Sequence, residues 1–267
     1  MLVFVFIVTA SFSARASDTS WGNCFLGDVW VLVDNTLSMY DYKTGSIDAT
    51  VDADSEYQND PFELAQMIVT NLMDSNHDAR AGFAYFPSEP SNLPRNLKTS
   101  SFRPRGEKVI KQPYDISKFL TDDLGGIVAR IRKASENKPK VTLHPHALVK
   151  SKNGTYITRG LELALRGHTR SSKSEHVEHE KYEKVIIIIT DGEDVLPLTT
   201  RSYSNSLKQQ GWNILPVFFG TNKTNQEEEK VRSHLQKISW NRIAESSFVD
   251  TVELDQLQEF FGQFTCG

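Results

Sequence analysis

The chain has 267 residues, of which 39% are hydrophobic and 24% are charged, and its formal net charge is −4. This composition is too apolar for a disordered chain, and the acidic excess argues against a general nucleic-acid binder. Two cysteines are too few for a disulfide-rich scaffold or a four-cysteine zinc site.

The N-terminus has the pattern of a secretory signal peptide. An apolar stretch over 2–12 precedes small residues at Ala14 and Ala16. This small-x-small spacing is typical of signal cleavage, so we expect residues 1–16 to be removed. A buried N-terminal strand is the alternative interpretation. Because no segment is apolar over the roughly 18 residues that a membrane span needs, we expect a secreted, extracellular protein without a membrane span.

Strand and helix patterns alternate along the rest of the chain. The run from Val185 to Ile189 is wholly apolar and β-branched, which is typical of a central parallel strand covered on both faces. Pro216 indicates a strand nearer the sheet edge. Asp60, Pro61 and Glu63 form a capping-box pattern at a helix start. In chain order, the expected elements are strand 28–34, helix 61–73, strand 79–86, helix 115–131, helix 158–167, strand 185–189, helix 199–210, strand 214–219, helix 225–238, weak strand 247–249 and helix 255–264.

This alternation predicts an α/β fold, with a doubly wound, mostly parallel sheet flanked by helices on both faces. The sequence contains no internal repeat and no low-complexity linker. We therefore expect one domain from about residue 22 to residue 267.

Oxygen-bearing side chains follow two of the predicted strands and open one predicted helix. Asp34, Thr36 and Ser38 come after the first strand, Thr155 precedes the helix predicted from 158, and Asp191 follows the apolar strand. Sites in open parallel sheets lie at the carboxyl ends of strands, so the three loops are expected to meet. Hard oxygen ligands suit Mg²⁺ or Mn²⁺. The alternative is that these side chains only cap turns and helices.

Together these residues resemble the metal-ion-dependent adhesion site (MIDAS) of von Willebrand factor type A (VWA) domains, the integrin I-domain family with a Rossmann-like fold. Asp34, Thr36 and Ser38 match the first motif, with Thr36 in place of its first serine, while Thr155 and Asp191 match the second and third. The resemblance covers nearly the whole chain after the signal peptide. It implies a non-enzymatic module whose cation coordinates a carboxylate of an extracellular or cell-surface partner protein. In some relatives the last helix slides to change affinity.

Two predicted loops near this site are basic, and we expect them to form an electropositive rim that attracts acidic ligands. Ordinary solvated loops are the alternative. The basic residues are Arg95, Lys98, Arg103, Arg105, Lys138, Lys140, Lys150 and Lys152.

Other side-chain clusters give weaker metal signals. The insertion 41–60 is acidic, but it lacks the glycine turn and spacing of an EF-hand, so a flexible loop is favoured over an accessory Ca²⁺ site. The pairs His144/His146 and His176/His179 have no third ligand in the sequence, and solvated loops are the favoured interpretation.

Two covalent modifications are expected outside the cell. Cys24 and Cys266 lie near the two ends of the mature chain and are expected to pair, with two free thiols as the alternative. Asn222 is the better of two glycosylation sequons, because a glycan on Asn153 would obstruct Thr155.

Enzyme classes fit the sequence poorly. A haloacid-dehalogenase-like phosphatase would need a nucleophile where Leu32 stands. A dinucleotide-binding enzyme would need a glycine-rich turn after a strand, and no Gly-x-Ser-x-Gly elbow supports a serine hydrolase. The remaining alternative to a metal-dependent adhesion module is a secreted structural or matrix component with a degenerate, non-binding metal site.

Overall fold

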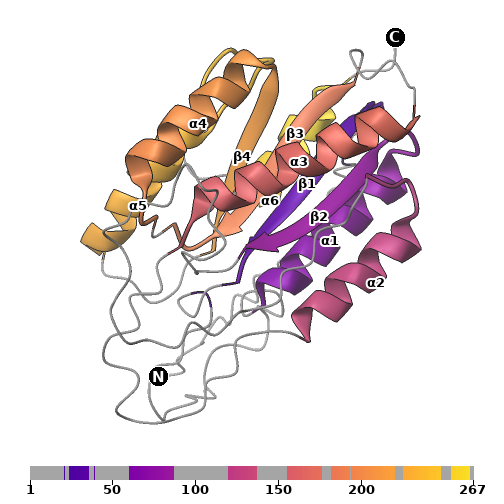
Figure 1. Ribbon diagram of the computed structural model, residues 1–267, viewed down its shortest axis with the longest axis horizontal. Helices are drawn as coiled ribbons and strands as arrows, with labels where there is room; N and C mark the ends of the chain where they lie inside the picture. Colours follow the sequence, from indigo (N-terminus) through magenta and orange to yellow (C-terminus); the bar gives the residue numbers. More distant parts are fainter. Residues whose placement is uncertain are drawn as a thin grey trace, which may run out of the picture.

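The computed structural model describes residues 21, 24–35, 39, 60–86, 120–136, 155–175, 182–192, 194–219, 225–247 and 254–264. Within these ranges, four strands alternate with six helices (Figure 1). The strands are β1 (Gly27–Asp34), β2 (Arg80–Phe86), β3 (Glu183–Thr190) and β4 (Trp212–Phe218). The helices are α1 (Pro61–Ser75), α2 (Leu124–Ser135), α3 (Ile157–Glu175), α4 (Pro197–Gln209), α5 (Asn225–Ile238) and α6 (Leu254–Gly262).

The four strands form a single parallel sheet in the order β2-β1-β3-β4 (Figure 1). The chain runs from β1 to β2 on one side and then crosses to β3 on the other, so the strand order reverses between β1 and β3. In open α/β sheets, ligands bind at the carboxyl ends of strands beside such a reversal. Pro216 lies in β4, at the edge of the described sheet, as its lack of an N–H predicted.

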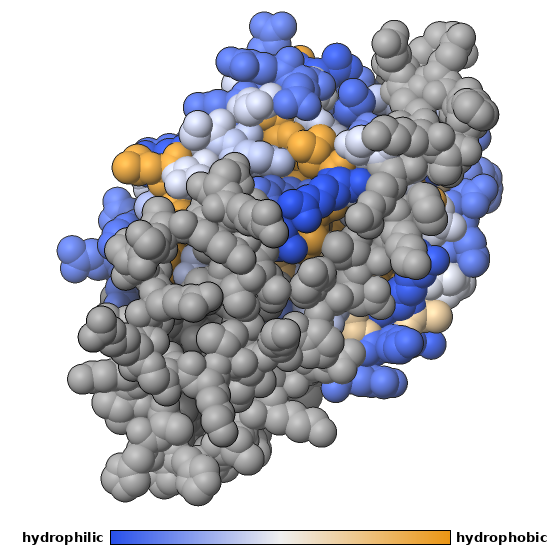
Figure 2. Space-filling view, viewed as in Figure 1, coloured by the Kyte–Doolittle hydropathy of each residue, from blue (hydrophilic) through white to orange (hydrophobic). Residues whose placement is uncertain are grey.

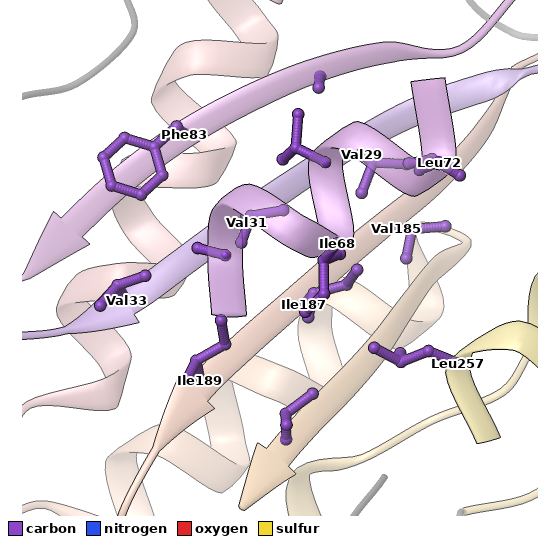
Figure 3. Packing of buried hydrophobic residues seen from close by; sticks show 14 of the residues in the cluster. Val29, Val31, Val33, Ile68, Leu72, Phe83, Val185, Ile187, Ile189 and Leu257 are labelled. Atoms are coloured by element: carbon purple, nitrogen blue, oxygen red, sulfur yellow. The ribbon is translucent and has the colours of Figure 1, made fainter. Parts of the chain in front are cut away.

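Helices cover both faces of the sheet and create two hydrophobic cores. Along β1, Val29, Val31 and Val33 belong to one core and Trp30 and Leu32 to the other, because successive side chains of a strand point to opposite faces. Helices α1, α2 and α6 complete the first core, whose packing around the β1 valines is drawn in Figure 3. Helices α3, α4 and α5 complete the second. The predicted doubly wound fold is confirmed.

The N-terminal cap of α1 is formed as predicted. Pro61 occupies the first helical position, and the Asp60 carboxylate accepts the backbone N–H of Phe62 at 3.0 Å. This bond satisfies a donor that the helix leaves without an internal partner. Asp60 is therefore the N-terminal cap of α1.

The predicted start of the second helix at Asp115 is wrong. Helix α2 begins at Leu124, after Asp123 has accepted the N–H of Gly126 at 3.0 Å. Thr121 instead forms an isolated antiparallel bridge to β2, in which it exchanges backbone hydrogen bonds of 2.9 and 3.0 Å with Ala81. Residues 120–123 are therefore not helical, and the earlier part of the expected helix, residues 115–119, lies outside the described ranges.

The predicted end of the third helix near Gly167 is also wrong, because α3 continues to Glu175. Gly167 lies against the Trp30 ring of β1, and a Cβ on Gly167 would come within 2.0 Å of that ring. The glycine therefore permits close packing between the helix and the sheet.

The bounds of two other helices are close to those predicted. Helix α5 has the predicted bounds, and α4 begins two residues before its predicted start. Gly211 follows the end of α4 and has a φ of 83°.

Few large hydrophobic side chains are exposed in the described part of the chain. Leu26, Leu198 and Ile243 are the three exposed ones, and the described surface in Figure 2 is mostly hydrophilic with small hydrophobic areas. No described helix has the length and apolarity to cross a membrane.

The weak strand predicted at 247–249 is described only at Ser247, which does not lie in a strand. Residues 248 and 249 lie outside the described ranges.

Candidate metal site

The two predicted acidic ligands lie at the carboxyl ends of neighbouring strands, where the strand order reverses. Asp34 is the last residue of β1, and Asp191 directly follows Thr190, the last residue of β3. All three residues are fully buried. The register that pairs Val33 with Ile189 brings the two strand ends side by side. Neighbouring parallel strands therefore bring the two carboxylates to one edge of the sheet.

Two hydroxyls hold the Asp34 carboxylate. Thr155 Oγ1 donates to Asp34 Oδ2 at 3.0 Å, and Thr190 Oγ1 donates to the same oxygen at 2.8 Å. The two donors come from positions 121 and 156 residues further along the chain. Hydrogen bonds to a charged acceptor are stronger than those between neutral groups, so this network orients the carboxylate firmly. The structure therefore brings Asp34 and Thr155 together, as the sequence predicted.

The Thr155 segment is anchored to the loop that carries Asp191. Thr155 forms a parallel bridge with Asp194, and its carbonyl accepts the N–H of Val195 at 2.9 Å. Helix α3 begins two residues later, at Ile157. Thr155 and the loop that carries Asp191 thus share a backbone contact beside the carboxylates.

A glycine shapes the turn after Asp191. Gly192 has a φ of 77°, a region that side chains with a Cβ rarely adopt, and a Cβ there would lie 2.2 Å from Val231 of α5. Its N–H donates to Thr190 Oγ1 at 3.0 Å, while the N–H of Asp191 donates to Met39 Sδ at 3.1 Å. The turn is therefore held by Thr190 of β3 and by Met39, and Gly192 allows α5 to pack closely against it.

Helix α5 contributes a residue that the sequence analysis did not identify. His234 Nε2 lies 3.1 Å from Asp194 Oδ2, and both side chains are largely buried. Burial, together with the Asp194 carboxylate, raises the pKa of the Tyr156 hydroxyl above its usual value. His234 and Asp194 are 40 residues apart in the sequence, and no motif spacing connects them. The pair ties α5 to the loop that also carries Asp191.

Several predicted site residues lie outside the described ranges. These are the ligands Thr36 and Ser38, the sequon Asn222, the cysteine Cys266, both histidine pairs, residues 41–59 of the acidic insertion, and the eight basic rim residues. Asn35 and Met39, which are described, are both buried. The roles of the residues outside these ranges stay predictions.

The donor set fits a hard cation, although the metal-binding role of these residues is itself a prediction. Asp34, Thr155 and Asp191 offer only oxygen atoms, which suits Mg²⁺ or Mn²⁺ better than a soft metal. Among the described residues, no three histidine, cysteine, aspartate or glutamate side chains gather as a metal site. The predicted site does not require such a group, since it combines two carboxylates with three hydroxyls.

Comparisons with known proteins find matches to this chain by structure and not by sequence. No protein-family model and no curated protein matches the sequence. One crystal form of proximal thread matrix protein 1 from the mussel byssus aligns with a TM-score of 0.50 and 15% identity, over 91% of this chain and 49% of that one. This chain thus spans about half the length of the mussel protein.

Two further solved structures align less closely. The VWA domain of SpRpn10 has a TM-score of 0.44 and 11% identity, over 91% of this chain and 100% of that one. Another structure of the mussel protein, described with a zinc-occupied MIDAS motif, has a TM-score of 0.47 and 15% identity, over 90% of this chain and 46% of that one. The chain has a VWA-like, integrin I-domain-like fold, and identities this low say nothing about activity.

Proposed function

We propose that this VWA-like fold is a secreted, metal-dependent protein-binding module and not an enzyme. In this proposal Mg²⁺ or Mn²⁺ is held by Asp34, Thr36, Ser38, Thr155 and Asp191, and it coordinates an acidic group of a partner protein. The observation that carries the proposal is the contact of Thr155 with Asp34 beside the Asp191 turn, at the reversal of strand order.

The chemistry of the donors supports a cation that remains a Lewis acid. Two carboxylates balance the formal charge of a divalent ion but do not fill its coordination shell, and hydroxyls coordinate it without adding charge. A cation of this kind attracts a further carboxylate, and Mg²⁺ commonly keeps coordination positions filled by water or ligand. An acidic side chain from a partner is therefore a suitable additional ligand.

Positions next to the site support the assignment of the two remaining ligands. Asn35 donates its backbone N–H to the Phe86 carbonyl at 3.3 Å, and Met39 contacts Asp191. Thr36 and Ser38 lie between these two points in the sequence.

The predicted signal peptide over 1–16 and the eight predicted basic rim residues complete the proposal. An extracellular module with a basic rim would attract acidic partners.

Direct titration with Mn²⁺ tests the metal site. We expect the mature protein to bind one Mn²⁺ by isothermal titration calorimetry. Asp34→Asn should weaken this binding by at least about 100-fold, because losing even an outer-shell partner of a metal commonly costs 10–100-fold in affinity. Asp60→Asn is the matched control, since asparagine replaces aspartate well at a helix N-cap.

Partner binding is tested with the same proteins. Wild type and Asp60→Asn are expected to recover an extracellular partner in Mn²⁺ and to lose it in EDTA, whereas Asp34→Asn recovers none. Thermal unfolding in EDTA must show that Asp34→Asn is folded. If it is not, Thr155→Val serves as the second variant. Absence of Mn²⁺ binding by the wild type would contradict the proposal and favour a structural component with a degenerate site.

A further inference from the structure

Thr190 joins the two acidic parts of the candidate site, although it is not one of the predicted metal ligands. It is the last residue of β3, directly before Asp191, and it is fully buried. Its hydroxyl donates to Asp34 Oδ2 at 2.8 Å and accepts the backbone N–H of Gly192 at 3.0 Å. One side chain therefore contacts both the carboxylate of β1 and the turn after β3.

The direction of both hydrogen bonds is determined by chemistry. A backbone N–H can only donate, so the Thr190 oxygen is the acceptor for Gly192. The hydroxyl has a single proton, and an ionised Asp34 carboxylate can only accept it. Threonine is branched at Cβ and has few χ1 choices in a strand, so the hydroxyl is held in one orientation. The Thr190 side chain thereby links Asp34 to the Gly192 turn.

Thr190 differs from Thr155, the other hydroxyl on Asp34 Oδ2. Thr155 lies outside the strands and is a predicted ligand of the cation. Thr190 belongs to β3, which is paired on both sides, with β1 and with β4. Its position is therefore set by the sheet and not by a loop. This makes Thr190 the fixed support of the carboxylate.

We propose that Thr190 is a positioning residue that orients Asp34 and the Asp191–Gly192 turn to receive the cation. The inference rests on the proposed function, because it concerns the same metal site. Outer-shell partners that orient metal ligands commonly contribute 10–100-fold to metal affinity. Removal of the Thr190 hydroxyl should therefore weaken metal binding even though Thr190 does not contact the ion.

Two substitutions separate the hydroxyl from the rest of the side chain. Thr190→Val keeps the branched shape and removes the hydroxyl, and we expect it to weaken Mn²⁺ binding by about 10–100-fold in calorimetric titration. Thr190→Ser keeps the hydroxyl, and we expect it to restore most of the affinity. Unfolding of each variant in EDTA reports stability independently of the metal.

Thr200→Val is the matched control. Thr200 is also fully buried, and its hydroxyl lies 2.6 Å from that of Thr158. Removing this hydroxyl should lower stability in EDTA but leave Mn²⁺ affinity unchanged. A general loss of stability would affect Thr200→Val and Thr190→Val alike, whereas a positioning role affects the metal affinity of Thr190→Val alone.

The outcomes distinguish this inference from the proposed function. If the wild type binds Mn²⁺, Asp34→Asn does not, and a folded Thr190→Val binds as well as the wild type, the positioning role is wrong and the metal site remains. If the wild type binds no Mn²⁺, both proposals fail. If Thr190→Val is unfolded in EDTA, Thr190→Ala is titrated instead, and wild-type affinity in that variant overturns the inference.

Discussion

Single polar side chains hold the candidate site from outside the set of predicted ligands. Thr190 contacts Asp34, and His234 contacts Asp194 in the loop that also carries Asp191. An unsatisfied buried acceptor costs about 1–3 kcal/mol, so these contacts stabilise carboxylates that lie away from water. At the scale of the residue, buried side chains that are not predicted ligands contact both the Asp34 carboxylate and the loop that carries Asp191.

A second group of buried polar residues lies between α3 and α4. Glu162 is largely buried, and Arg159 Nη1 lies 3.4 Å from its Oε2. Burial raises the pKa of Glu162 despite the neighbouring Arg159 and Arg166. Burial also raises the pKa of Tyr203 to about 12, with the Glu162 carboxylate adding to the effect.

We expect the Tyr203 hydroxyl to make the stability of the protein depend on pH in the alkaline range. Its pKa is higher in the folded state than the ordinary value of 10.0. Between about pH 10 and pH 12 the unfolded chain therefore loses the proton first, and the free energy of unfolding falls as the pH rises. We expect Tyr203→Phe to show a shallower fall over this window, measured by urea unfolding at several pH values. Identical slopes for the two proteins would contradict this expectation.

At the scale of elements, glycine decides how closely α3 packs on the sheet. A Cβ at Gly160 would lie 2.7 Å from the Phe86 ring of β2, and one at Gly167 would lie 2.0 Å from the Trp30 ring of β1. Two turns of the helix therefore rest directly on aromatic rings. Since α3 begins two residues after Thr155, this packing also helps to set the position of Thr155.

Gly167→Ala tests this packing. Overpacking a well-filled core commonly costs about 1–3 kcal/mol, which outweighs the gain of up to about 1 kcal/mol from replacing glycine in a helix. We expect a lower free energy of unfolding by urea denaturation. Gly262→Ala is the control, because no atom lies within 4 Å of a Cβ there, and it should be neutral or slightly stabilising. Equal effects of the two substitutions would show that the Trp30 contact does not limit packing.

At the scale of the whole molecule, the segment before β1 packs against the C-terminal helix. Phe25 makes edge-on ring contacts with Phe261 at 5.0 Å and with Phe264 at 4.9 Å, and Trp21 stacks on Phe261 at 5.7 Å. Phe25 directly follows Cys24, and Phe264 precedes Cys266 by two residues. The described neighbours of the two cysteines are therefore in contact, which supports the predicted pairing.

We expect Cys24 and Cys266 to form a disulfide that stabilises the protein by about 2–4 kcal/mol, chiefly by restricting the unfolded chain. The double variant Cys24→Ser/Cys266→Ser should unfold at lower urea concentration than the wild type. Reductant should lower the stability of the wild type to a similar level and leave the double variant unchanged. Peptide mapping without reduction checks the linkage directly, and two free thiols in the secreted protein would contradict it.

Local patterns predicted much of this architecture. Apolar runs located all four described strands, and Asp60 with Pro61 located the start of α1. Strand periodicity and helix caps depend on neighbouring residues, so a single sequence contains this information. The edge of the sheet where Asp34 and Asp191 lie was also predictable, because parallel strands bring their carboxyl ends to the same edge.

Contacts between distant segments decided the rest. The sequence pattern predicted the wrong start for α2, because Thr121 pairs with Ala81, and the wrong end for α3, because Gly167 packs on Trp30. The hydrogen bond between Thr190 and Asp34 spans 156 residues. No local pattern encodes which side chains meet across such distances. The sequence by itself therefore determined the four described strands and the placing of Asp34 and Asp191 at one edge of the sheet. The tertiary structure decided where α2 begins, where α3 ends and which donors hold the Asp34 carboxylate.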